Sequence, residues 1–167
     1  MKHHFIALLV ALLSACATPA FAQQSILVGA VLPQTGILAD IAADLRKSLL
    51  LWQDEVNAGG GLLGRRVELM LLDDRSESGA TGKLYEQLIL EHKADLLIGP
   101  LGSAASLGAA AVAERNRRVM INATGAARTV HRSGFRYVFQ TATPLSAYGM
   151  GPVELARSLG LKRVVVL

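Results

Sequence analysis

Short, almost continuously apolar runs alternate along this chain with longer segments of helical period. The runs that we predict as strands are Ile26–Leu32, Val67–Asp73, Asp95–Gly99, Val119–Asn122, Tyr137–Gln140 and Val164–Leu167. The segments that we predict as helices are Asp40–Asn57, Ser78–His92, Ala104–Asn116 and Leu145–Leu159. Strands that are apolar throughout are typical of parallel sheets covered on both faces. With right-handed crossovers, this order predicts an α/β fold with a doubly wound open parallel sheet.

The first 22 residues have the pattern of a secretory signal peptide. Lys2 precedes an apolar run at Phe5–Leu13, and Ala20-Phe21-Ala22 supplies small residues around a cleavage point after Ala22. The run is too short to span a bilayer. Export from the cytoplasm is therefore expected, either as a soluble protein or, because Leu13-Ser14-Ala15-Cys16 resembles a lipoprotein cleavage site, anchored by a lipid at Cys16.

A glycine-rich loop spells the letters of a dinucleotide-binding fingerprint. Gly59, Gly61 and Gly64 have the spacing G-x-G-x-x-G. A phosphate-binding loop follows a strand and opens a helix, whereas this loop follows a predicted helix and precedes the strand at Val67. The glycines are thus expected to end a helix and turn the chain, with Gly59 or Gly60 in the left-handed position. No cofactor is predicted.

Loops that follow the strands should carry the functional residues, because ligands of open α/β sheets bind at the carboxyl edge. After the third strand, Gly102 permits close approach of a ligand and Ser103 offers a hydroxyl at a helix start. That combination suits a carboxylate, but Ser103 could equally cap its helix. Thr124 follows the fourth strand and is either a ligand contact or an ordinary polar loop residue.

Other polar residues give weaker indications. Asp73 and Asp74 could form an acid–base pair, although a turn or capping role is the preferred interpretation. Ser103, His131 and an aspartate could in principle form a hydrolytic triad, yet the nucleophile-elbow pattern is missing. The net charge of +4 comes from scattered basic residues without interleaved aromatic ones, so nucleic-acid binding is not expected. His92 and His131 do not have ligand spacing, so no metal site is predicted.

Four successive motifs resemble those of a known family. The stretches "ILVGAVLPQTG", "VNAGGGLLGRRVELMLLDD", "LIGPLGS" and "VMINATGA" are similar, in order and spacing, to the periplasmic substrate-binding proteins of branched-chain amino acid ABC transporters. That family has the type I periplasmic-binding-protein fold, in which two α/β lobes close around a ligand. The resemblance implies a signal peptide at 1–22, a ligand-binding lobe 1 at 23–140, and at 141–167 a crossing and the start of lobe 2. The chain is then expected to be an incomplete, amino-terminal fragment.

The resemblance also implies roles for individual residues. Ser103, after Gly102, falls on the serine that holds the ligand carboxylate. Thr124 and Ala126 fall on the next ligand loop, and Ala126 stands where the family often has a hydroxyl residue. Ile41 stands where branched-chain amino acid binders often carry an aromatic residue. These two departures favour another small carboxylate, an aromatic acid or an amide over leucine, isoleucine or valine.

Tyr148, just after the crossing, is expected either to face the cleft or to pack at the hinge. The whole protein would then be a solute-binding component that captures an amino acid or related small carboxylate. Its partner would be an ABC permease in the membrane. The alternative from a different class is a sensor of the same fold that feeds a signalling partner. No covalent chemistry is implied, so the chain is not expected to be an enzyme.

Overall fold

The computed structural model describes residues 24–163 and residue 165. The predicted signal peptide with Cys16 and most of the predicted strand at 164–167 therefore lie outside the described residues. No helix between residues 24 and 163 is both long enough and apolar enough to cross a membrane.

Five parallel strands form one sheet in the order β2-β1-β3-β4-β5. Their bounds are β1 Ile26–Leu32, β2 Val67–Asp73, β3 Leu96–Ile98, β4 Met120–Asn122 and β5 Val138–Gln140. The order reverses at β1, which pairs with β2 on one side and with β3 on the other. This is the predicted doubly wound sheet, and its topological switch point lies between β1 and β3.

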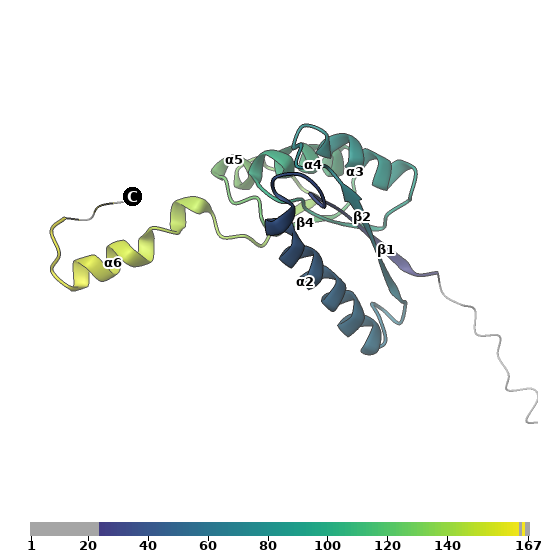
Figure 1. Cartoon of the computed structure of the whole chain (residues 1–167), viewed down its shortest axis with the longest axis horizontal. Coiled ribbons are helices and arrows are strands. Elements are labelled where there is room, and N and C mark those ends of the chain that lie inside the picture. The colour runs from purple at the N-terminus through teal and green to yellow at the C-terminus, as the bar shows by residue number, and fades with distance from the viewer. Residues whose placement is uncertain (1–23, 164, 166–167) are drawn as a thin grey trace, which may run out of the picture.

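Helices cover the two faces of the sheet unequally. Their bounds are α2 Ala39–Ala58, α3 Thr81–Leu90, α4 Ser103–Arg115, α5 Arg128–His131 and α6 Met150–Ser158, with a short 3-10 turn, η1, at Leu145–Ala147. α3 and α4 lie side by side over one face, α2 lies on the other, and α6 projects away from the sheet (Figure 1).

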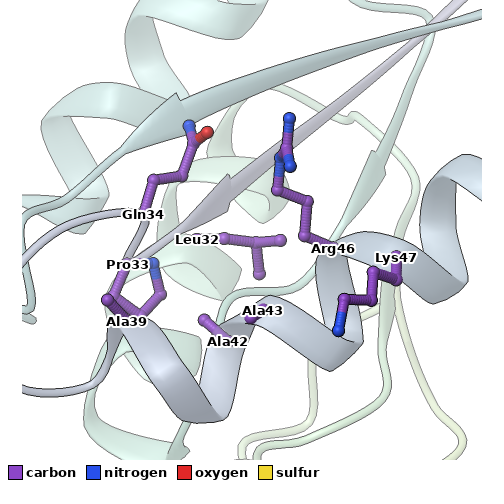
Figure 2. Close-up of a pocket in the computed structure, with 8 residues that line it drawn as sticks. All are labelled: Leu32, Pro33, Gln34, Ala39, Ala42, Ala43, Arg46 and Lys47. Atoms are coloured by element: carbon purple, nitrogen blue, oxygen red, sulfur yellow. The ribbon is translucent and has the colours of Figure 1, made fainter.

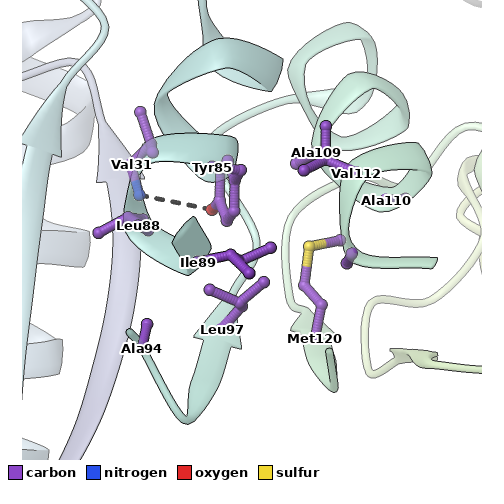
Figure 3. Close-up of a cluster of buried hydrophobic side chains, with 11 residues drawn as sticks. Val31, Tyr85, Leu88, Ile89, Ala94, Leu97, Ala109, Ala110, Val112 and Met120 are labelled. Carbon is purple, nitrogen blue, oxygen red and sulfur yellow. Dashed lines mark hydrogen bonds between the residues drawn. The ribbon is translucent and has the colours of Figure 1, made fainter. Parts of the chain in front are cut away.

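The main core fills the space between the sheet and the α3–α4 layer (Figure 3). Leu88, Leu97 and Met120 are almost fully buried there, and each such side chain contributes about 1.5–3 kcal/mol by leaving water. Tyr85 is also fully buried. Its hydroxyl donates to the Ile98 carbonyl and accepts from the Val31 N–H, 3.4 Å away. Burial raises the pKa of this phenol.

α2 covers only part of the opposite face. Leu49 and Trp52 of this helix pack towards β1 and β2. Beyond them an apolar groove of about 440 Å³ runs towards β3 and β4, lined among others by Ile98 and Ile121. Ile121 is 45% exposed, and Phe139 in β5 is 56% exposed. This sheet face is therefore partly bare within the part of the chain that the structure describes.

The glycine loop has the predicted structural role. Gly59 follows the last residue of α2, and Gly60 and Gly61 have positive φ angles of 97° and 81°. A Cβ on Gly61 would lie 2.0 Å from the Arg65 carbonyl oxygen, so only glycine fits there. The turn delivers the chain to the amino end of β2, opposite the edge where ligands bind. The prediction of a helix end and turn is confirmed.

Three predictions of helix starts are wrong. α3 begins at Thr81, three residues after the predicted start at Ser78, and the Thr81 hydroxyl donates to Asp74, 3.2 Å away. Gly102, not Ser103, is the N-cap of α4. The predicted helix Leu145–Leu159 is divided into η1 and α6. Pro152 lacks an N–H and fits only in the first turn of a helix, so α6 begins just before it.

Candidate functional site

Two loops at the carboxyl edge of the sheet are joined by one threonine. The loop after β3 reaches Gly102, whose φ of 87° turns the chain into α4. The Gly102 N–H donates to Thr124 Oγ1 over 3.1 Å, and the same hydroxyl donates to the Pro100 carbonyl. Thr124 thus uses its donor and one acceptor position to hold the two loops together. Gly102 also borders the switch point between β1 and β3, where open α/β sheets bind ligands.

Ser103 lies at the centre of this arrangement. Its Oγ accepts a hydrogen bond from the Ala127 N–H at 3.0 Å. The hydroxyl proton therefore remains free to donate to a ligand. The backbone N–H groups of Ser103, Ala104 and Ala105 donate to no acceptor among the described residues, as is usual in the first turn of a helix. These donors, together with the positive end of the α4 dipole, can hold a carboxylate.

The structure brings four of the six predicted site residues together. Gly102, Ser103, Thr124 and Ala126 lie on the two joined loops, and the Ala126 carbonyl accepts from the Leu145 N–H at 2.8 Å. Ile41 on α2 is 64% exposed and Tyr148 after η1 is 57% exposed. Among the described residues, no hydrogen bond joins either of these two to the other four.

A second pair of loops is fixed by the Asp73 carboxylate. It accepts hydrogen bonds from the backbone N–H groups of Gln34 (2.8 Å), Thr35 (3.2 Å) and Arg75 (2.9 Å), and from the Thr35 hydroxyl (2.7 Å). Partial burial alone would raise the pKa of Asp73, but the hydrogen bonds from Arg75, Thr35 and Gln34 together outweigh it and lower the pKa. Asp73 therefore ties the loop after β1 to the loop after β2.

Asp74 has a similar structural role. Its carboxylate accepts from the Ser76 N–H at 3.1 Å and from the Thr81 hydroxyl, and the residue is buried. The interpretation of both aspartates as turn residues is confirmed. The triad alternative has no support in the geometry, because no hydrogen bond joins Ser103 to His131 within the described residues.

A small pocket of about 190 Å³ opens beside the loop after β1 (Figure 2). Leu32 and Ala42 form part of its apolar floor, and the side chains of Gln34 and Arg46 extend on either side of Leu32. Gln34 Nε2 donates to the Leu71 carbonyl at 3.3 Å. None of the predicted site residues lines this pocket, so it is separate from the Gly102–Ser103 loop.

Sequence reasoning missed two residues that support the site. Asn122, the last residue of β4, and Ser106 in α4 are both fully buried polar residues beneath the two loops. In the sequence, Asn122 is marked only as one amide in an otherwise apolar strand, and Ser106 only as one hydroxyl in an alanine-rich helix. Neither signal indicates the partner that such a side chain will find.

The sheet order β2-β1-β3-β4-β5, with the two joined loops at its carboxyl edge, defines a doubly wound α/β domain. The family model described as "Periplasmic binding protein" matches residues 25–167. The chain therefore belongs to the periplasmic binding protein family. The predicted family and fold are confirmed.

Individual relatives agree with this assignment. The Leu/Ile/Val-binding protein homolog 7 of Brucella abortus is 32% identical over 114 residues, which cover 68% of this chain and 28% of the relative. A solved leucine-binding protein from Thermotoga maritima has a TM-score of 0.70 and 26% identity, covering 81% of this chain and 38% of that chain. An R. palustris solute-binding protein in complex with benzoate has a TM-score of 0.71 and 27% identity, covering 83% and 38%. This chain thus spans less than two-fifths of the length of each of these relatives.

Proposed function

We propose that this chain provides the first ligand-binding lobe of an extracytoplasmic solute-binding protein that serves an ABC transporter. In this proposal residues 23–140 are lobe 1, and residues 141–167 cross to and begin lobe 2. The observation that carries it is the free donor set at the start of α4, namely the Ser103 hydroxyl and the first N–H groups of the helix. Binding would be non-covalent, and closure of a second lobe would complete the site.

The ligand class that fits this donor set is a small carboxylate. The relatives named above include a leucine-binding protein and a protein in complex with benzoate, so an amino acid and an aromatic acid both belong to the candidates. Ala126 offers no side-chain hydroxyl for an amino group, and Ile41 offers no aromatic ring. Both features favour an aromatic or other simple acid over leucine, isoleucine or valine. An ABC permease would be the partner, and the periplasm the compartment.

A thermal-shift screen of the whole protein against amino acids, aromatic acids, short carboxylates and amides tests the ligand class. A ligand that binds only the folded state raises the unfolding midpoint by mass action. We expect the largest rise with a carboxylate, and the corresponding amide should give little or no shift. A rise with amides and none with acids would contradict the proposed carboxylate site.

Replacement of Ser103 tests the residue that carries the proposal. Ser103→Ala removes a hydrogen bond to a charged ligand, which is worth about 1.5–3 kcal/mol, so calorimetry should show an affinity loss of roughly 10- to 150-fold. The control is Ser48→Ala, because Ser48 is exposed on α2 and its hydroxyl only donates to the Asp44 carbonyl. Equal affinities of the two variants would refute the assignment of Ser103.

A further inference from the structure

Asn122 is a fully buried amide at the carboxyl end of β4. It lies directly under the loop that contains Thr124 and Ala126. A buried amide is costly unless its donors and acceptor are all paired, so its partners show what it does in the fold.

The Asn122 side chain joins three elements. Its Oδ1 accepts from the Gly125 N–H at 3.2 Å and lies 2.9 Å from the Ser106 hydroxyl of α4. Its Nδ2 donates to the Gly125 carbonyl at 3.1 Å and to Gln140 Oε1 of β5 at 2.7 Å. The amide therefore binds both the N–H and the carbonyl of Gly125, and it also contacts α4 and β5.

Ser106 extends the same contact to the other ligand loop. Its hydroxyl lies 2.7 Å from the Gly102 carbonyl as well as 2.9 Å from Asn122 Oδ1, and its single proton serves these acceptors. Gly102 is the residue that starts α4 and precedes Ser103. The buried pair Asn122–Ser106 is thus in contact with both loops from below.

Two glycines pack closely against Asn122. A Cβ on Gly125 would lie 2.5 Å from Ser106 Oγ and 2.6 Å from Asn122 Nδ2. A Cβ on Gly99, before the other loop, would lie 2.8 Å from Asn122 Oδ1. The backbone at Gly99 and at Gly125 therefore lies in direct contact with the Asn122 amide. A residue with a Cβ at either position would collide with this amide.

We propose that Asn122 is a positioning residue of the ligand site. It fixes the position of the Gly125 peptide. Through this peptide it also positions the Thr124 hydroxyl, which accepts from the Gly102 N–H, and the Ala127 N–H, which donates to Ser103. The inference rests on the proposed function, because it assigns Asn122 the task of keeping that donor set arranged before a ligand arrives. A site held in its binding geometry loses less ordering entropy when it binds.

Amide hydrogen exchange of the ligand-free protein tests the positioning directly. Asn122→Ala should accelerate exchange at Gly102, Gly125 and Ala127 by tenfold or more, with a smaller effect at central β1 amides such as that of Ala30. The control is Leu88→Ala, which removes a buried side chain from the core without touching the loops. It should accelerate exchange in β1 and leave the loop amides within twofold. Unchanged loop exchange in Asn122→Ala would overturn the proposal.

Affinity of the whole protein for L-leucine and for benzoate supplies the second measurement. We expect Asn122→Ala to weaken binding tenfold or more at a temperature where it is fully folded, and Leu88→Ala to stay within twofold of wild type. Equal losses in both variants would mean that Asn122 contributes only stability. If wild type binds neither probe, L-leucine and benzoate are excluded as ligands, while the exchange experiment still decides the role of Asn122.

Gly125→Ala provides a variant that keeps Asn122 in place. The new methyl group must push the loop off the amide, so it should reproduce the faster loop exchange and the weaker binding. Gly108→Ala is its control, since a Cβ on this α4 glycine would meet nothing closer than 4.0 Å. Normal loop exchange and binding in Gly125→Ala would overturn the proposal even if Asn122→Ala failed to fold.

Discussion

Asp73 is held by four donors, and its charge therefore matters for stability. Hydrogen bonds favour the ionised form, so the pKa of Asp73 is lower in the folded chain than in the unfolded chain. Such a group stabilises the fold above the unfolded pKa of about 3.9, and this contribution is lost as the pH falls through the folded pKa. We expect the free energy of unfolding to fall on acidification below about pH 4, and less steeply in Asp73→Asn.

Urea denaturation between pH 2 and pH 6 measures this difference. Thr35→Val, which removes only the side-chain donor, should give a change between those of wild type and Asp73→Asn. Identical pH profiles of wild type and Asp73→Asn would show that the hydrogen bonds do not favour the ionised carboxylate.

At the same scale, the sequence predicted the location of polar residues better than their partners. Ser103 and Thr124 were expected at one edge because parallel strands all end there. The partners depend on distances between segments that are far apart in the chain. The hydrogen bonds of Thr124 with Gly102 and Pro100, and those of Asp73 with the loop after β1, are of this kind. Asn122 was missed for the same reason, since one polar residue in a short apolar run does not reveal its neighbours.

Among the elements, strands were predicted more accurately than helix starts. The apolar runs of β1 and β2 coincide with the observed bounds, and in β1 burial of nearly every residue accounts for the continuous signal. Helix starts depend on single residues. Ser103 and Thr81 are good capping residues, yet their hydroxyls are engaged by Ala127 and Asp74 from other elements, so tertiary contacts override the local preference.

The turn between α2 and β2 gives a prediction at the scale of elements. Gly60 and Gly61 both have positive φ, but a Cβ on Gly60 would meet nothing within 4 Å, whereas one on Gly61 would collide with the Arg65 backbone. Gly60→Ala should cost about 1–2 kcal/mol for its left-handed conformation alone. Gly61→Ala should cost at least about 1 kcal/mol more, since the turn must also shift.

Chemical denaturation of the two variants checks this pair. Equal destabilisation would mean that the loop moves freely around Gly61. Because the turn lies at the amino edge of the sheet, neither substitution should change the affinity for a ligand at the carboxyl edge.

For the whole molecule, the unequal covering of the sheet is the main consequence of the topology. One face is sealed by α3 and α4, while on the other α2 leaves β3, β4 and β5 partly bare. Contiguous exposed apolar surface of this kind binds apolar dyes. Residues 24–167, produced alone, should therefore enhance the fluorescence of anilinonaphthalene sulfonate while keeping a cooperative unfolding transition.

The bare face can be tested by polar substitution at its most exposed side chains. Combining Ile121→Thr with Phe139→Ser should remove most of the dye fluorescence, because both side chains stand on the uncovered part of the sheet. Leu63→Ser is the matched control, since Leu63 is 92% exposed in the glycine-rich turn and is not among the residues that line the apolar groove. If Leu63→Ser lowers the fluorescence as much as the double variant does, the dye reports scattered apolar residues rather than the open sheet.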